Sequence, residues 1–355
     1  MARDQKAVHH TVSALWNDYL DADWLAATAE PVLNPLQKIV DPHHHVFWNS
    51  PFPYRPESLF EDLDSGHNVV GTVYAESGQM YRSRGPEHLK PVGEAEYATG
   101  VAAMAASNEI LACQACAGLI GSYDLTLAPE LVRETLEKQI AVSDGRLKGI
   151  RIYVNFDPHG FVDWGNEPAQ GLLSDVDFLR GFEVLAELDL VVDIMGLFHQ
   201  LPEIAEFART HPDSKIVVNH LGGPCGVGPY REESERAREG WLSGIRAIAA
   251  QPNIFLKLGG VANPFYSGLD FRSDPQAPTS EALQAAFTPF FEPAIAELGP
   301  SRCMFESNWP VDKRDCSYRV LWNAFKRVAS EYSETEQSQM LADTAIGVYQ
   351  LDLDG

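Results

Sequence analysis

Short apolar runs recur along the chain, and most are followed by a polar or glycine-containing loop and then by a segment with helical periodicity. Runs that are apolar almost throughout, rather than alternating, are typical of parallel strands covered on both faces. We therefore predict strands at residues 38–41, 68–75, 110–120, 147–154, 190–195, 215–220, 253–260 and 302–307.

Helical patterns fill most of the intervals between these strands. They cover residues 86–107, 128–143, 172–188, 201–211, 238–251 and 279–298, and a last helix is predicted within 332–351. Strands and helices in this number and order match an α/β fold of the (β/α)8 TIM-barrel type. A doubly wound open sheet is the alternative, but no glycine-rich phosphate-binding fingerprint follows the first strand. We expect residues 37–355 to form the barrel and residues 1–36 a short helical N-terminal extension.

The chain is strongly acidic, with 27 Lys and Arg against 50 Asp and Glu among 355 residues and a formal net charge of −23. A surface of this sign disfavours nucleic acid and anionic membrane as partners. An anionic small molecule stays open as a ligand, because a site can be locally basic inside an acidic shell.

A cytoplasmic location is expected. No apolar run approaches the roughly 20 residues of a membrane span, and the first residues do not resemble a secretory leader. The five cysteines are sparse and odd in number, which fits a reducing compartment. The spacing of Cys113 and Cys116 is that of a redox pair, but their apolar surroundings favour core packing.

Polar side chains stand at or just beyond the C-terminal ends of the predicted strands, where a TIM barrel builds its active site. They are Asp41, His43, His45, Glu76, Arg151, Tyr153, Asp193, His199, Asn219, His220, Lys257, Glu306 and Asn308.

The stretch DPHHH, residues 41–45, has a geometric interpretation. Side chains of a strand alternate between its two faces, so His43 and His45 point the same way and His44 points to the outer layer. Two imidazoles about 6–7 Å apart at Cα can converge on one ion or one substrate oxygen. In the alternative, these histidines only cap the strand and bind the backbone.

Five motifs in chain order, DPHHH, GIR, VVNHLGGP, KLGG and CMFESNWPVD, resemble the amidohydrolase superfamily. The resemblance covers about residues 37–350 and is strongest to the branch that contains pyrone-dicarboxylate and sugar-acid lactonases. It implies a (β/α)8 hydrolase with His43, His45 and His220 at the reaction centre. It also implies that Arg151 and Lys257 contact substrate oxygens.

At the eighth strand the chain reads ESNWP where the proteins that it resembles read GSDWP. Asn308 donates and accepts hydrogen bonds but cannot take up a proton at neutral pH. Glu306, two residues earlier, would point the same way in an extended strand, so we hypothesise that it supplies the missing carboxylate. In the alternative, Glu306 forms a buried ion pair with Arg151 or Lys257.

The one cofactor that we expect is a divalent metal ion of the zinc type, and we expect no organic cofactor. His43, His45 and His220, with or without His199, could form a three-imidazole zinc site with a free position for water. Against a metal stands the loss of the eighth-strand carboxylate, and the pyrone-dicarboxylate lactonase of the resembled branch works without one. The imidazoles would then polarise the scissile carbonyl directly.

The candidate substrate contacts besides Arg151 and Lys257 are Glu76, Tyr153 and His199. Arg151 suits bidentate binding of a carboxylate, although an ion pair with Glu76 or Glu306 is the alternative for its side chain. Long loops at 155–171 and 261–280 could cover the mouth.

The leading prediction is a hydrolase that opens a lactone or related ester of a small carboxylated molecule, with His220, Glu306, Asn308 and Arg151 as catalytic residues. The first alternative is a lyase that decarboxylates or hydrates an aromatic-derived acid. The second alternative is a catalytically dead barrel that binds a ligand. We also expect a homodimer, with Trp16, Tyr19 and Trp24 of the N-terminal extension as a candidate contact surface.

Overall fold

The computed structural model describes residues 21–48, 53–109, 111–160 and 170–353. Eight parallel strands pair in chain order, from the first to the eighth. They are β1 (Lys38–His44), β2 (Asn68–Ala75), β3 (Gln114–Ser122), β4 (Leu147–Tyr153), β5 (Val191–Met195), β6 (Ile216–Val218), β7 (Ile254–Leu258) and β8 (Cys303–Phe305). A parallel bridge between His44 and Trp309 joins the chain beyond β8 to β1.

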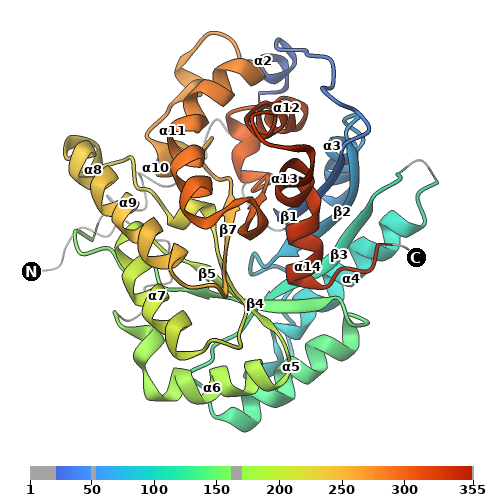
Figure 1. Ribbon diagram of the computed structural model, residues 1–355. Helices are drawn as coiled ribbons and strands as arrows, with labels where there is room; N and C mark the ends of the chain where they lie inside the picture. The colour runs from blue at the N-terminus through green and yellow to red at the C-terminus, as the bar shows by residue number, and fades with distance from the viewer. Residues whose placement is uncertain (1–20, 49–52, 110, 161–169, 354–355) are drawn as a thin grey trace, which may run out of the picture.

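One principal helix follows each strand, and Figure 1 shows these helices around the strands. They are α3 (Pro56–Leu63), α4 (Val92–Ala106), α5 (Pro129–Val142), α6 (Val176–Glu187), α7 (Leu201–Thr210), α9 (Ser234–Ala249), α11 (Ser280–Leu298) and α12 (Tyr318–Ala329). The short helices α8 (Pro229–Glu232) and α10 (Pro264–Ser267) precede α9 and α11. The predicted (β/α)8 TIM barrel is thereby confirmed.

Local sequence explains where several helices begin. The Asp175 carboxylate accepts hydrogen bonds from the N–H groups of Asp177 and Phe178 and so caps α6. Proline occupies the first turn of α3 and α5, where its missing N–H costs nothing. Gly181 lets α6 approach the loop between β3 and α5, because a Cβ there would lie 2.0 Å from the Leu125 carbonyl oxygen.

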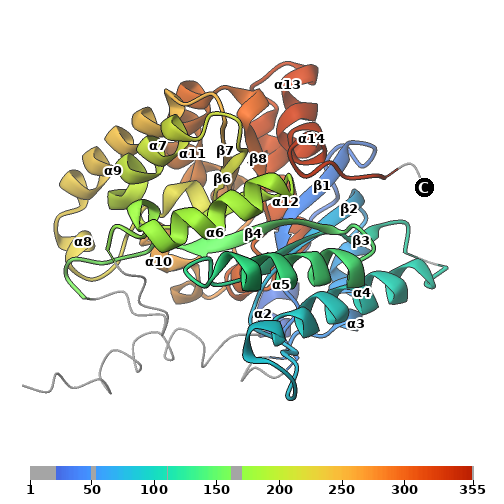
Figure 2. The same ribbon diagram turned by 90° about the horizontal axis from the view of Figure 1, so that it is seen from below.

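The C-terminal segment closes the end of the barrel opposite the strand C-termini. It contains α13 (Glu334–Ser338) and α14 (Thr344–Tyr349), and Figure 2 shows α14 beside β1. Its side chains pack against side chains of the strands in one buried apolar cluster, which includes Val40, Val73, Ile120, Val191, Val217, Met304, Ala345, Val348 and Tyr349.

The described part of the N-terminal extension contains one short helix, α2 (Ala22–Ala26). It then runs along α11 and α12, where Leu33 N–H donates to Asn323 and Lys326 donates to the Leu33 and Asn34 carbonyls. Trp24 donates to the Asp274 carbonyl and packs against Arg272 of the same chain. Trp16 and Tyr19 lie outside the described residues, and the division of the chain at residue 36 stays a prediction.

Among the helices of the described residues, none combines the length and the apolar character that crossing a membrane requires.

Candidate active site

The end of β1 places its three histidines as strand alternation predicts. His43 Nε2 and His45 Nε2 lie 3.2 Å apart on the inner side of the barrel. His44 points the other way, and its Nε2 lies 2.8 Å from Thr72 Oγ1. All three rings are buried, so each needs defined partners rather than water.

Glu306, just beyond β8, lies between two of the predicted histidines. Its Oε1 accepts hydrogen bonds from the backbone N–H of His220 at 3.0 Å and from His220 Nδ1 at 2.7 Å. Its Oε2 lies 2.9 Å from His43 Nδ1 but has no hydrogen-bond partner within the described residues. The carboxylate therefore contacts two histidines from β1 and the end of β6, rather than Arg151 or Lys257.

Two glycines after β7 make room for this cluster. A Cβ at Gly259 would lie 2.4 Å from Glu306 Cγ. A Cβ at Gly260 would lie 2.9 Å from His220 Nδ1, and the backbone there has φ +75°. The motif KLGG thus lets the β7 backbone pass close to both side chains.

Arg151 already has a carboxylate partner. Its Nε donates to Glu76 Oε1 at 2.8 Å and its Nη2 to the Glu76 carbonyl at 2.7 Å, while Tyr153 OH donates to the same Oε1 at 2.5 Å. The ion pair with Glu76 that sequence analysis left open is present. Only the Nη1 group faces a histidine, at 3.2 Å from His43 Nε2.

Lys257 is paired in the same way, on the other side of His43. Its Nζ lies 3.1 Å from Asp193 Oδ2 and 3.3 Å from His43 Nδ1, and the side chain is fully buried. Tyr349 of α14 donates to Asp193 at 2.6 Å, and Asn219 also donates to that carboxylate. Arg151 and Lys257 are therefore each balanced by a buried carboxylate.

The two inner histidines are neutral near neutral pH. Burial lowers the pKa of His43 well below its ordinary value, and the charge of Lys257 adds to the effect. Burial, then the Arg151 charge, does the same to the pKa of His45. His45 Nδ1 lies 2.9 Å from the Ala75 carbonyl oxygen, so Nδ1 must carry the ring proton. The other ring nitrogen, Nε2, therefore presents a lone pair.

No neutral tautomer of His43 satisfies all four of its neighbours. Nδ1 faces the acceptor Glu306 and the donor Lys257. Nε2 faces the lone pair of His45 and the donor Arg151. Whichever ring nitrogen of His43 carries the proton, two of these contacts are mismatched.

The same atoms fit a divalent metal ion. His43, His220 and Glu306 can each offer one ligand atom, and these atoms lie within 4.8 Å of one another. Two imidazoles and a carboxylate form a donor set used by catalytic zinc, and the unpartnered Glu306 Oε2 is an atom that a cation would satisfy. The predicted ligand set of His43, His45 and His220 shares two members with this group, and Glu306 is the third.

Asn308 does not follow the strand alternation that was extrapolated to it. Strand β8 ends at Phe305, and Asn308 has a left-handed backbone with φ +53°. Its Nδ2 donates to Asp312 Oδ1 at 2.9 Å. Sequence analysis missed Asp312, whose only signal is a carboxylate four residues after Asn308 within a turn.

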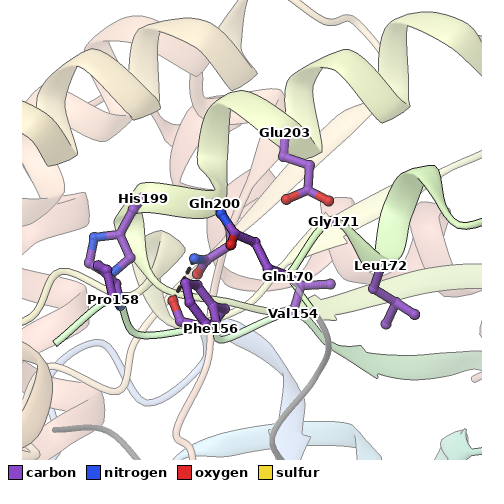
Figure 3. A pocket seen from close by; sticks show the side chains of 9 residues that line it. All are labelled: Val154, Phe156, Pro158, Gln170, Gly171, Leu172, His199, Gln200 and Glu203. Carbon is purple, nitrogen blue, oxygen red and sulfur yellow. Dashed lines mark hydrogen bonds between the residues drawn. The ribbon is translucent and has the colours of Figure 1, made fainter. Parts of the chain in front are cut away.

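His199 lies at the rim, beside β4 and β5. Its described contacts are with Phe198 and Tyr230, whose OH lies 3.3 Å from His199 Nε2, and not with the inner histidines. The pocket in Figure 3 has a volume of about 160 Å³. It is lined by Val154, Phe156, Pro158, Gln170, Gly171, Leu172, His199, Gln200 and Glu203.

Comparison with known proteins agrees with this architecture. The sequence model of the amidohydrolase family matches residues 40–351. L-fucono-1,5-lactonase of Burkholderia multivorans is 29% identical over 325 residues, which cover 88% of this chain and 96% of the lactonase.

Two solved structures share the fold. An amidohydrolase from Burkholderia multivorans with bound zinc has a TM-score of 0.65 at 23% identity, covering 88% of this chain and 99% of the other. A putative 2-pyrone-4,6-dicarboxylic acid hydrolase from Pseudomonas putida has a TM-score of 0.60 at 13% identity. The match covers 89% of this chain and 98% of the hydrolase.

Proposed function

The chain belongs to the amidohydrolase family, and on that premise we propose that it hydrolyses a lactone or related ester of a small carboxylated molecule. The observation that carries the proposal is the buried cluster of His43, His220 and Glu306, in which a carboxylate oxygen lacks a hydrogen-bond partner among the residues that the structure describes. The fucono-lactonase relative, which aligns over 88% of this chain, supports lactones as the substrate class.

His43, His220 and Glu306 would hold a divalent ion, which supplies Lewis acidity toward a carbonyl oxygen or a water molecule. Water attacks the lactone carbonyl, the ring C–O bond breaks, and the proton of the water ends on the leaving ring oxygen. When no ion occupies the cluster, Glu306 Oε2 takes that proton first, because no donor of the described residues hydrogen-bonds to it. His220 holds the carboxylate in place through its backbone N–H and Nδ1.

The remaining predicted residues surround this reaction. His45 presents a neutral Nε2 beside His43, and Arg151 Nη1 is the guanidinium edge left for a substrate oxygen. Tyr153 and Glu76 hold Arg151 in that orientation. Lys257 acts through His43, because its fully buried ammonium is paired with Asp193, and His199 contacts the outer part of the substrate from the rim.

The proposal includes a cytoplasmic location and a homodimer. The five cysteines are free and buried, which supports a reducing compartment. The dimer is supported only by the aromatic residues of the N-terminal sequence. One of them, Trp24, packs against Arg272 of its own chain.

A substrate screen with product masses tests the proposal. Purified protein is incubated with sugar-acid lactones and with 2-pyrone-4,6-dicarboxylate, and a product heavier by one water is expected. A product that has lost carbon dioxide would instead support the decarboxylase alternative. A tight ligand recovered unchanged would support a binding barrel.

A further inference from the structure

Asp312 is a buried carboxylate that the reaction above does not use. It lies in the turn Val311–Arg314 after β8, and its side chain is only 1% exposed. Burial raises the pKa of Asp312 well above its ordinary value, whereas hydrogen bonds from the Asn308 side chain and the Ala262 backbone lower it. A carboxylate in such a place is retained only with well-placed donors, and Asn308 is the side chain that provides one.

The bond to Asp312 fixes which end of the Asn308 amide is free. Because Nδ2 donates to the carboxylate, the oxygen Oδ1 is turned away from it. Within the described residues, Oδ1 has no hydrogen-bond partner. An oriented and unpaired acceptor is therefore available to a substrate hydroxyl or a water molecule.

The backbone around Asn308 runs beside the reactive histidines. His45 N–H donates to the Trp309 carbonyl at 2.6 Å, and Ser307 Oγ donates to the His43 carbonyl at 3.3 Å. Glu306, two residues earlier, contacts His43 and His220 directly. Asn308 thus lies between Ser307 and Trp309, which are both hydrogen-bonded to the end of β1.

We propose that Asp312 is a positioning residue, which holds the Asn308 amide so that its neutral oxygen faces the reaction centre; this rests on the proposed function. Asn308 Oδ1 then accepts a hydrogen bond from the substrate or the attacking water without removing its proton.

This arrangement also accounts for asparagine at position 308. An aspartate there would place two buried carboxylates within hydrogen-bonding distance of each other, and like charges so close repel. N308D alone is expected to lower turnover. The double variant N308D/D312N restores an amide–carboxylate hydrogen bond, with the carboxylate now at position 308 and the amide at position 312. It is therefore expected to fold better than N308D.

Kinetics of D312A and D312N test the proposal. D312A is expected to lower kcat about 10- to 100-fold with KM changed less than about threefold, because a misplaced group costs rate rather than binding. D312N is expected to keep most of kcat, since the amide oxygen of Asn accepts the same hydrogen bond. The double variant N308A/D312A should be no slower than either single variant, as expected for two residues that act as one unit.

D315N is the matched control. Asp315 is a buried carboxylate in the same segment, but its partner is Arg314 at 2.9 Å rather than Asn308. Its replacement should leave kcat within about threefold of the wild type. Equal losses in D312A and D315N would overturn the proposal, because both would then reflect the turn rather than the amide.

Crystal structures of D312A and D312N provide a readout that does not depend on turnover. The Asn308 amide should rotate in D312A and stay in place in D312N; an unchanged amide in D312A overturns the proposal. If D312A does not fold, D312S replaces it. A wild type that opens no lactone refutes the proposed function, while these structures still decide the role of Asp312.

Discussion

Two halves of the barrel interior differ in how completely their polar groups are paired. The reactive half consists of His43, His45, His220 and Glu306, where one carboxylate oxygen has no partner in the described part of the chain and His43 has mismatched neighbours. The supporting half consists of Glu76, Arg151, Asp193 and Lys257, where each cation has its carboxylate. A buried polar group left unsatisfied is costly, so the unpartnered oxygen in the reactive half is where we expect a ligand to act.

Replacing Glu306 should have the largest effect on turnover. We expect E306Q to lose about 100- to 10,000-fold in kcat, because it removes the proton acceptor of the reactive half. Steady-state kinetics measure the loss, and circular dichroism confirms the fold.

E134Q is the control for that variant, since Glu134 contacts His88 at 3.0 Å on the outer helices, far along the chain from the reactive half. It should turn over like the wild type. Near-normal turnover in folded E306Q would remove Glu306 as the base.

Breaking the supporting half should instead reduce stability. We expect K257M to lower the free energy of unfolding by about 3–5 kcal/mol, because it leaves the Asp193 carboxylate buried without its cation. Denaturant unfolding measures the change. The exposed pair of Lys138 and Glu134 is the comparison, and K138M should cost less than about 1 kcal/mol. Equal losses in both would contradict the distinction.

Tyr349 connects the C-terminal helix to the supporting half and should have an intermediate effect. Y349F removes one hydrogen bond to the charged Asp193, which contributes about 1.5–3 kcal/mol to stability. We expect unfolding at lower denaturant concentration, with kcat within about threefold of the wild type. A large loss of turnover at unchanged stability would place Tyr349 in the reactive half.

His199 at the rim should have the smallest effect. Since it contacts Tyr230 and not the inner histidines, H199A is expected to raise KM by about 10-fold or less, the loss of one modest contact, with kcat unchanged. Steady-state kinetics with the best substrate of the screen measure both constants. A fall in kcat as large as that of E306Q would move His199 into the reaction.

Sequence analysis predicted the fold and the inner face of β1, because apolar runs and strand alternation are local patterns. The contact of Glu306 with His220 was not predicted: both residues were placed at strand ends, but only Arg151 and Lys257 were considered as partners of Glu306. The Arg151–Glu76 pair was one of two alternatives for Arg151, but the pair of Lys257 and Asp193 was not predicted, since Asp193 meets Tyr349 only after α14 closes the barrel. The orientation of Asn308 was not predicted, because its left-handed backbone lies beyond the end of β8. Strand alternation gives no information about side chains in turns.

The most direct test of the reactive half is the metal content of untagged protein after exposure to zinc and removal of the free ion. The wild type and K257M should each retain about one zinc ion per chain, and H220A and E306Q should retain far less, because His220 and Glu306 belong to the cluster that fits the ion. Wild-type protein that retains no zinc and turns over substrate unchanged in the presence of a chelator would contradict the account.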